Sequence, residues 1–305
     1  MKYQDILPSG KPVIFRGAAT AQITPFSGGG VDYAALGTMV DRQLKSKISA
    51  LVLCGTTGES PTLTRDEVKS ITSFVKSRTD ERLPVIVGVG CADTQKSISA
   101  LKDAEAAGAD AVMAVTPYYN RPTADGIIAH FYKLAEASPL PLIVYTVPSR
   151  TGTALSFDTY CTLSEHENIV AVKEASGDLK LIERLCQTLP DSLSVYCGSD
   201  ELNLPAMSVG AAGVVSVLSN IKPREVTELC TCAAASDMKK ARELDRTLFP
   251  LSRDMFIRSN PIPVKAAASI LGLCENELRL PLTPIDREGY EYLVFRLSSF
   301  GAAAR

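Results

Sequence analysis

The chain has 305 residues, 46% hydrophobic and 22% charged, and its formal net charge at pH 7 is −2. This composition can fill the core of one large α/β domain, with or without a smaller region attached. No basic cluster suggests a nucleic-acid surface. No apolar run reaches the roughly 18 residues of a membrane span, and the polar start at Met1 to Asp5 does not resemble a signal peptide. We therefore expect a cytoplasmic protein that contacts neither nucleic acid nor membrane.

The eight cysteines and two histidines give no pattern for a metal site or a disulfide framework. The cysteines have no Cys-x-x-Cys spacing, and Cys230 and Cys232 would face different sides of a helix. Scattered cysteines in apolar segments are typical of buried thiols in a reducing compartment. With only His130 and His166 available, we expect no histidine-based catalysis and no metal.

Strand and helix patterns alternate from about residue 15 to residue 235. Short apolar, β-branched runs bounded by turn residues predict eight strands, at 15–24, 50–54, 84–90, 110–116, 142–147, 169–175, 194–198 and 212–217. Each is followed by a helical pattern, at 32–47, from Thr64, at 94–107, 123–137, from Phe157, and at 179–189, 201–209 and 224–235. Eight such pairs predict a (β/α)8 TIM barrel with parallel strands.

The strand patterns stop near residue 236. Helical patterns separated by prolines follow at 238–258, 264–273 and 286–299, and residues 1 to about 14 show no clear period. The expected organisation is a TIM barrel with a short N-terminal extension over residues 1–236, and a C-terminal helical region over residues 237–305.

The sixth strand carries a lysine on an apolar face. Because residues two apart on a strand share a face, Lys173 points the same way as Ala171 and Ile169. An ammonium on such a face is costly, and burial favours the free amine, which is a nucleophile. The simpler interpretation is a lysine at a strand end that reaches water.

Other polar residues follow the strands at the end where TIM barrels have their active sites. They are Thr56 and Thr57 after strand two, Tyr118 and Tyr119 after strand four, Tyr145 within and Arg150 beyond strand five, and Gly198, whose missing side chain leaves room for a ligand. Each alone has an ordinary explanation as a turn, core, interface or solvated residue. Their common position on one rim favours a site.

Imine catalysis needs this set of groups. A lysine amine attacks a ketone, water leaves, and the iminium withdraws electrons to form an enamine. The proton transfers need a positioned acid or base, and with no histidine nearby Tyr145 is the candidate. The arginine fork of Arg150 suits a substrate carboxylate.

Several motifs resemble those of the pyruvate-dependent lyase superfamily that includes N-acetylneuraminate lyase, and more closely those of the dihydrodipicolinate synthase family. The resemblance extends from about Gly17 to about residue 299. It rests on Gly55-Thr56-Thr57-Gly58-Glu59, Thr116-Pro117-Tyr118-Tyr119-Asn120-Arg121-Pro122, Tyr145-Thr146-Val147-Pro148-Ser149-Arg150-Thr151-Gly152, Val172-Lys173-Glu174, Asn260-Pro261-Ile262-Pro263-Val264-Lys265 and Leu280-Pro281-Leu282-Thr283-Pro284.

This resemblance implies a lyase that condenses pyruvate with L-aspartate 4-semialdehyde on the diaminopimelate–lysine route, using a covalent lysine–pyruvate imine and no separate cofactor. By it, Lys173 forms the imine, and Tyr145 transfers protons through Thr56 and through Tyr119 of a neighbouring subunit. It also implies that Thr57 and Val215, where relatives often have isoleucine, contact pyruvate, and that Arg150 holds the semialdehyde carboxylate. The shared tyrosine implies a homodimer as the smallest competent unit, and tetramers are common in the family.

The chain departs from the family pattern at Thr146, where asparagine is usual. It also departs where feedback-inhibited members bind lysine through a histidine, an asparagine and a glutamate. The matching positions here are Val68, Ala92 and Lys96, so we expect weak or absent inhibition by lysine.

The nearest alternative activity is a sister lyase or aldolase acting on a sialic or sugar acid, from which the Ser-Arg-Thr-Gly pattern around Arg150 separates this chain. A non-catalytic keto-acid-binding protein on the same scaffold would have lost the lysine, tyrosine or threonine.

Overall fold

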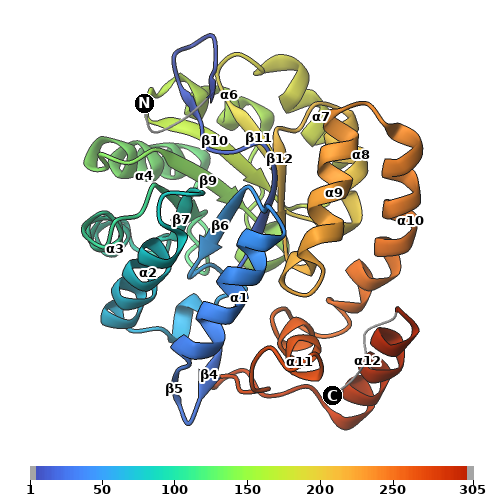
Figure 1. Ribbon diagram of the computed structural model, residues 1–305. Helices are drawn as coiled ribbons and strands as arrows, with labels where there is room; N and C mark the ends of the chain where they lie inside the picture. The colour runs from blue at the N-terminus through green and yellow to red at the C-terminus, as the bar shows by residue number, and fades with distance from the viewer. Residues whose placement is uncertain (1–4, 301–305) are drawn as a thin grey trace.

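The structure of the protein is a computed structural model, and it describes residues 5–300. Eight parallel strands form a closed barrel, pairing in the order in which they occur in the sequence, with the last pairing to the first. Figure 1 shows the helices arranged around this barrel. The strands are β3 (Gly17–Ala21), β6 (Ala50–Leu53), β7 (Val85–Gly88), β8 (Ala111–Val115), β9 (Leu142–Thr146), β10 (Ile169–Glu174), β11 (Ser194–Cys197) and β12 (Gly213–Ser216). The predicted (β/α)8 barrel is confirmed.

The strands are short runs of small and β-branched residues, buried on both faces because helices cover the outside of the barrel. In β10 every residue is buried. Its side chains alternate, so Lys173 points into the barrel and Glu174 points outward, where Tyr160 of the neighbouring helix donates a hydrogen bond to it. Burial raises the pKa of Glu174.

The helices between the strands begin where the sequence places capping residues. Asp32, Thr64, Asp93, Thr123, Ser156 and Asp178 each accept a hydrogen bond from a backbone amide in the first turn. Thr64 and Glu67 form a capping box. The helices are α1 (Tyr33–Lys45), α2 (Arg65–Thr79), α3 (Thr94–Ala106), α4 (Ala124–Ala137), α6 (Phe157–Glu165), α7 (Leu179–Thr188), α8 (Asn203–Ser208) and α9 (Pro223–Ala234).

Several short elements were not expected from the sequence. The N-terminal extension contains an antiparallel pair, β1 (Asp5–Ile6) and β2 (Pro12–Val13). Gly28 and Gly29 form the turn of a second pair, β4 (Phe26–Ser27) and β5 (Gly30–Val31). A one-turn helix, α5 (Pro148–Thr151), follows β9, and 3-10 turns occur at Ser60–Thr62, Asp200–Leu202 and Leu218–Asn220. Elements this short lack the periodicity that sequence patterns detect.

The last part of the chain is helical: α10 (Met238–Asp254), α11 (Ile262–Ile270) and α12 (Arg287–Ser299). Helix α10 packs on α9. Helices α11 and α12 lie at the end of the barrel opposite the β1–β2 pair (lower right in Figure 1). The segment that follows α11 reaches the β4–β5 pair, where the Gly29 amide donates to Glu277 Oε1 at 2.7 Å. The domain boundary at residues 236 and 237 stays a prediction, and it falls between α9 and α10. Within residues 5–300, no helix is both long enough and apolar enough to cross a membrane.

Candidate active site

The ends of β9 and β10 bring Tyr145 and Lys173 side by side. The two residues are register partners on adjacent parallel strands, so their side chains point to the same side of the sheet. Lys173 Nζ lies 4.1 Å from the centroid of the Tyr145 ring. Each residue is only 7% exposed. The amine and the phenol selected from the sequence are therefore neighbours inside the barrel, and neither faces solvent.

Lys173 is one of three buried lysines in the described part of the chain, and the other two are held by protein oxygens. Lys11 Nζ donates to the backbone oxygens of Ser164 and Ile169, and Lys265 Nζ donates to the Glu59 carboxylate. Between residues 5 and 300, no hydrogen bond or ion pair engages Lys173 Nζ. Its amine is thus available to a ligand in the barrel mouth.

The loop after β6 places Thr56 and Thr57 beside this pair. Cys54, at the end of the strand, has φ +52° and turns the chain sharply, and the Glu59 amide closes the turn on Thr56 O at 3.1 Å. Thr57 is buried, and its hydroxyl accepts a hydrogen bond of 3.0 Å from Asn260 Nδ2. No hydrogen bond joins Thr56 to the Tyr145 hydroxyl among the described residues, although both line the same cavity.

Arg150 reaches the same mouth from the one-turn helix α5. The turn starts at Pro148, a residue well suited to a first helical position, and ends at Gly152 with φ +68°. Arg150 Nη2 donates to Asn260 O at 2.9 Å. Asn260 therefore contacts both Thr57 and Arg150, and it ties the two sides of the mouth together from the C-terminal region.

A cavity of about 500 Å³ lies over Lys173 at the carboxyl ends of the strands. Apolar and polar side chains line it together, as in small-molecule sites. Gly198 is needed where it lies, because a Cβ there would come within 2.9 Å of Lys173 Cε and 2.7 Å of Ala175 Cβ. The sequence-predicted residues in the wall are Thr56, Thr57, Tyr145, Arg150, Lys173 and Gly198.

Comparisons with known proteins identify the family of this chain. The model of the dihydrodipicolinate synthetase family matches residues 14–299. The chain belongs to this family. The 4-hydroxy-tetrahydrodipicolinate synthase of Aquifex aeolicus is 44% identical over 90% of this chain and 94% of that protein, and the one from Thermoanaerobacter sp. (strain X514) is 39% identical over 94% and 97%.

Solved structures of dihydrodipicolinate synthases have the same fold. The crystal structure of the Aquifex aeolicus synthase superposes with a TM-score of 0.92 at 42% identity, over 95% of this chain and all of that one (100%). The chloride-inhibited synthase of Acinetobacter baumannii, solved in complex with pyruvate, gives a TM-score of 0.93 at 39% identity, with the same coverage of 95% and 100%.

Two of the predicted residues lie outside the cavity of this dihydrodipicolinate synthetase family member. Tyr119 has φ +71° and is 93% exposed. Val215 is buried in β12 and shares a face with Val217, which does line the cavity, but it lies two residues deeper. The roles of Tyr119 and Val215 therefore stay predictions.

A second hollow, of about 840 Å³, adjoins the cavity from outside the barrel. Thr56, Val147 and Arg150 line both spaces. Val68 and Lys96, two of the positions that match the lysine-binding pattern, line this hollow together with Ser60 and Tyr118. Burial raises the pKa of Tyr118.

Several residues that line the cavity have no role predicted from the sequence, among them Asp200, Phe256 and Asn260. Asp200 follows β11 and accepts hydrogen bonds from the backbone amides of Val217 and Leu218, at 2.8 and 2.9 Å, so it joins the ends of two strands. The position of the Asp200 carboxylate, three residues after the end of a strand, was a sequence signal for a residue near the active site. Phe256 and Asn260 lie far along the chain. The family motif that begins at Asn260 drew attention to that residue, and no sequence signal indicated Phe256.

Nothing in the described residues groups three or more histidine, cysteine, aspartate or glutamate side chains in a way that could hold a metal ion. The chemistry that the cavity offers is that of an amine, a phenol, hydroxyls and a guanidinium. The amine is the nucleophile in this set, and the others suit proton transfer and anion binding.

Proposed function

We propose that this chain is a 4-hydroxy-tetrahydrodipicolinate synthase, which condenses pyruvate with L-aspartate 4-semialdehyde. The observation that carries the proposal is a buried lysine amine that has no oxygen partner among residues 5–300. It lies 4.1 Å from the centroid of a tyrosine ring, and both residues line the same cavity. Curated relatives near 40% identity with this activity, matched along nearly their whole length, support it.

The first half-reaction is imine formation at Lys173. The amine attacks the pyruvate carbonyl carbon, the carbonyl π bond breaks, and the oxygen leaves as water after receiving protons. Loss of a proton from the methyl group then gives the enamine, with the iminium nitrogen accepting the electron pair. Tyr145, whose ring faces the amine, exchanges these protons with Thr56, and Thr57 binds the pyruvate carboxylate at the loop after β6. The lysine–pyruvate imine makes a separate cofactor unnecessary.

In the second half-reaction the enamine carbon attacks the aldehyde of the semialdehyde, whose oxygen takes a proton. The amino group of the bound chain then displaces the Lys173 nitrogen from the imine carbon, which closes the ring and frees the enzyme. Arg150 holds the semialdehyde carboxylate, because its guanidinium lies at the cavity mouth and presents two parallel donors.

Tyr119 completes the proton relay in the active site of a second copy. Its 93% exposure is unusual for a tyrosine, and it lies in the sequence beside Tyr118, which lines the outer hollow together with Thr56. A tyrosine from another copy could reach Thr56 through that hollow. The competent unit is then a homodimer, and two dimers form a tetramer.

The sister lyase activity on a sialic or sugar acid is the second candidate, and substrate comparison separates the two. Purified protein should form the cyclic product from pyruvate and L-aspartate 4-semialdehyde, and it should release no pyruvate from N-acetylneuraminate at matched concentrations. Cleavage of N-acetylneuraminate without the condensation would reject the synthase and favour the lyase.

Inhibition by lysine should be weak or absent. In the outer hollow Lys96 stands where the lysine-binding pattern has a glutamate, and Val68 stands where it has a histidine. A second ammonium would repel the ligand's own, and valine supplies no hydrogen bond. Titration of the condensation rate with L-lysine tests this, and a sub-millimolar inhibition constant would reject it.

A further inference from the structure

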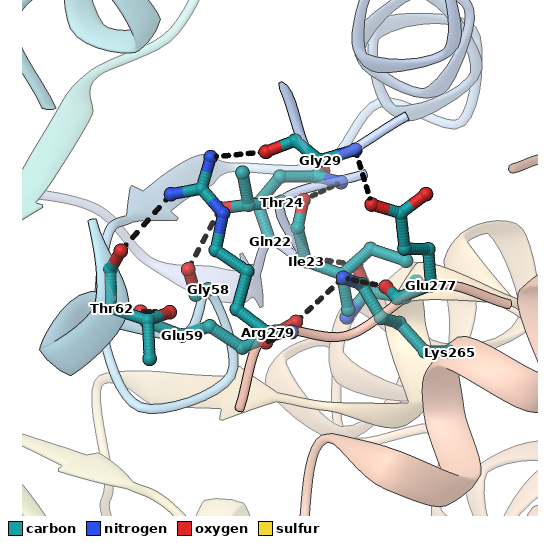
Figure 2. Close-up of polar contacts among 11 residues, drawn as sticks. Gln22, Ile23, Thr24, Gly29, Gly58, Glu59, Thr62, Lys265, Glu277 and Arg279 are labelled. Atoms are coloured by element: carbon teal, nitrogen blue, oxygen red, sulfur yellow. Dashed lines mark hydrogen bonds and ion pairs between the residues drawn. The ribbon is translucent and has the colours of Figure 1, made fainter. Parts of the chain in front are cut away.

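A fully buried ion pair lies under the loop that carries Thr56 and Thr57. The side chains of Lys265, on helix α11, and Glu59, at the end of the loop, are both 0% exposed, and Lys265 Nζ lies 2.5 Å from Glu59 Oε1. Lys265 Nζ also donates to Glu277 O at 2.6 Å and stands 4.0 Å from the centroid of the Phe26 ring. Figure 2 shows Lys265 pointing into this cluster from the C-terminal region.

Glu59 is built into the turn of the catalytic loop. It has φ +57°, a left-handed conformation that a glutamate does not favour by itself. Its amide bonds Thr56 O at 3.1 Å, and its second carboxylate oxygen accepts the Arg279 amide at 3.1 Å. Both oxygens of the Glu59 carboxylate are thus bonded by the C-terminal region. Because Glu59 is part of the loop, these bonds also fix the loop backbone.

Arg279 fixes the far end of the same loop. Its guanidinium donates to Thr62 O at 3.0 Å, to Gly29 O at 2.9 Å, and to both carboxylate oxygens of Glu67. The hydrogen bonds from Arg279 to the Glu67 carboxylate lower the pKa of Glu67 to about 2. Figure 2 shows Arg279 spanning the space between Thr62 and Gly29.

A buried ion pair is a poor way to gain stability, because desolvation offsets the attraction and apolar replacements are often as stable. Its fixed geometry, however, specifies one position for each partner. Glu59, the partner that belongs to the barrel, follows Thr56 by three residues and Thr57 by two in the sequence. The same C-terminal region also contacts Thr57 directly, through Asn260 Nδ2 at 3.0 Å.

We propose that Lys265 and Glu59 are positioning residues for catalysis. Their ion pair fixes the loop of Thr56 and Thr57 over Lys173, so helix α11 forms a working part of the active site. This inference rests on the proposed function, in which Thr57 binds the pyruvate carboxylate. The pair touches no substrate itself, since both side chains are fully buried.

The test compares Lys265→Met with Arg296→Met. Arg296 pairs with the buried Asp254 at 2.7 Å and joins α12 to α10, so it is a partly buried ion pair of the same C-terminal region that does not touch the loop. Glu59→Gln, which keeps the side-chain volume, is a second variant in case the first fails to fold. The double variant Lys265→Met/Glu59→Gln leaves no unpaired buried charge.

We measure the thermal midpoint of each variant first. At a temperature where the variant is folded, we then measure kcat, the KM values for both substrates, and the rate of pyruvate trapping by borohydride. We expect Lys265→Met and Glu59→Gln to lose at least about tenfold in kcat/KM for pyruvate and in trapping rate, with the KM for the semialdehyde little changed. Arg296→Met should lose thermal stability only. The double variant should regain stability while its kcat/KM for pyruvate stays low.

Two results would overturn the inference. One is wild-type trapping by Lys265→Met or Glu59→Gln at a lowered thermal midpoint. The other is recovery of both stability and kcat/KM in the double variant. Either would make the pair a structural element only. The wild-type protein distinguishes this failure from failure of the proposed function, because without the imine mechanism the wild type itself would trap no pyruvate.

Discussion

The substitution Gly198→Ala probes the close approach of the backbone at residue 198 to the Lys173 side chain. The backbone at residue 198 is outside the left-handed region, so alanine is conformationally acceptable and the effect is steric. The new Cβ would lie 2.9 Å from Lys173 Cε and 2.7 Å from Ala175 Cβ. Carbon atoms pack at about 3.5–4.0 Å, so relief of both overlaps needs a movement of about 1 Å.

Part of this movement falls on the end of the lysine chain, which is the more flexible partner. Overpacking in a core costs about 1–3 kcal/mol of stability, and misplacement of a reacting group by about 1 Å costs up to about 100-fold in rate. We therefore expect Gly198→Ala to lower kcat/KM for pyruvate by about 10- to 100-fold, with a modest loss of thermal stability.

The assay is the rate of borohydride trapping at pyruvate concentrations well below its KM, where the rate reports kcat/KM. Trapping is followed by intact-protein mass spectrometry and compared with a control of equal overlap. Gly289→Ala in α12 serves as that control, since its Cβ would lie 2.7 Å from Ile285 Cδ1, away from the cavity. It should lose stability and keep the wild-type trapping rate. Trapping by Gly198→Ala as fast as by the wild type would refute the reasoning.

Three further predictions concern single groups. Tyr145→Phe should lower kcat by about 10²–10⁴-fold with little change in the pyruvate KM, and a kcat within a few-fold of the wild type would show that Tyr145 does not move the protons. Arg150→Lys should raise the KM for the semialdehyde at least about tenfold, because a point charge replaces a two-donor fork, and an equal rise in the pyruvate KM would place the arginine elsewhere. Burial lowers the pKa of His130 from 6.5 to about 4, so in this range the unfolded chain binds a proton that the folded chain does not, and stability falls as the pH drops through this window. Relative to His130→Leu, the wild type should lose about 2 kcal/mol of unfolding free energy between pH 7 and pH 5 in urea titrations, and parallel pH profiles would contradict the shift.

The sequence predicts the barrel and its central pair well because both depend on local patterns. The twofold alternation of a strand places Lys173 inside the barrel, and the known geometry of a TIM barrel then brings strand ends such as that of Tyr145 to the same rim. Their adjacency follows from the register of two consecutive parallel strands. No contact between segments far apart in the sequence is needed.

Other parts of the site depend on contacts across more than a hundred residues, which single-sequence patterns do not contain. Asn260 bonds Thr57 from 203 positions away, and Lys265 bonds Glu59 from 206 positions away. A lysine on an apolar helix face is the signal that was available for Lys265, since Ala266, Ala267 and Ala268 follow it in a helix buried nearly throughout. Its partner could not be named without the fold.

The most direct test of the account is the site of the covalent adduct. After incubation with pyruvate and reduction with borohydride, peptide mass spectrometry should place a single reduced adduct on Lys173, the buried lysine of residues 5–300 whose amine has no oxygen partner. The variant Lys173→Met should give no adduct. No adduct in the wild-type protein, or an adduct on Lys11 or Lys265 in place of Lys173, would contradict the mechanism.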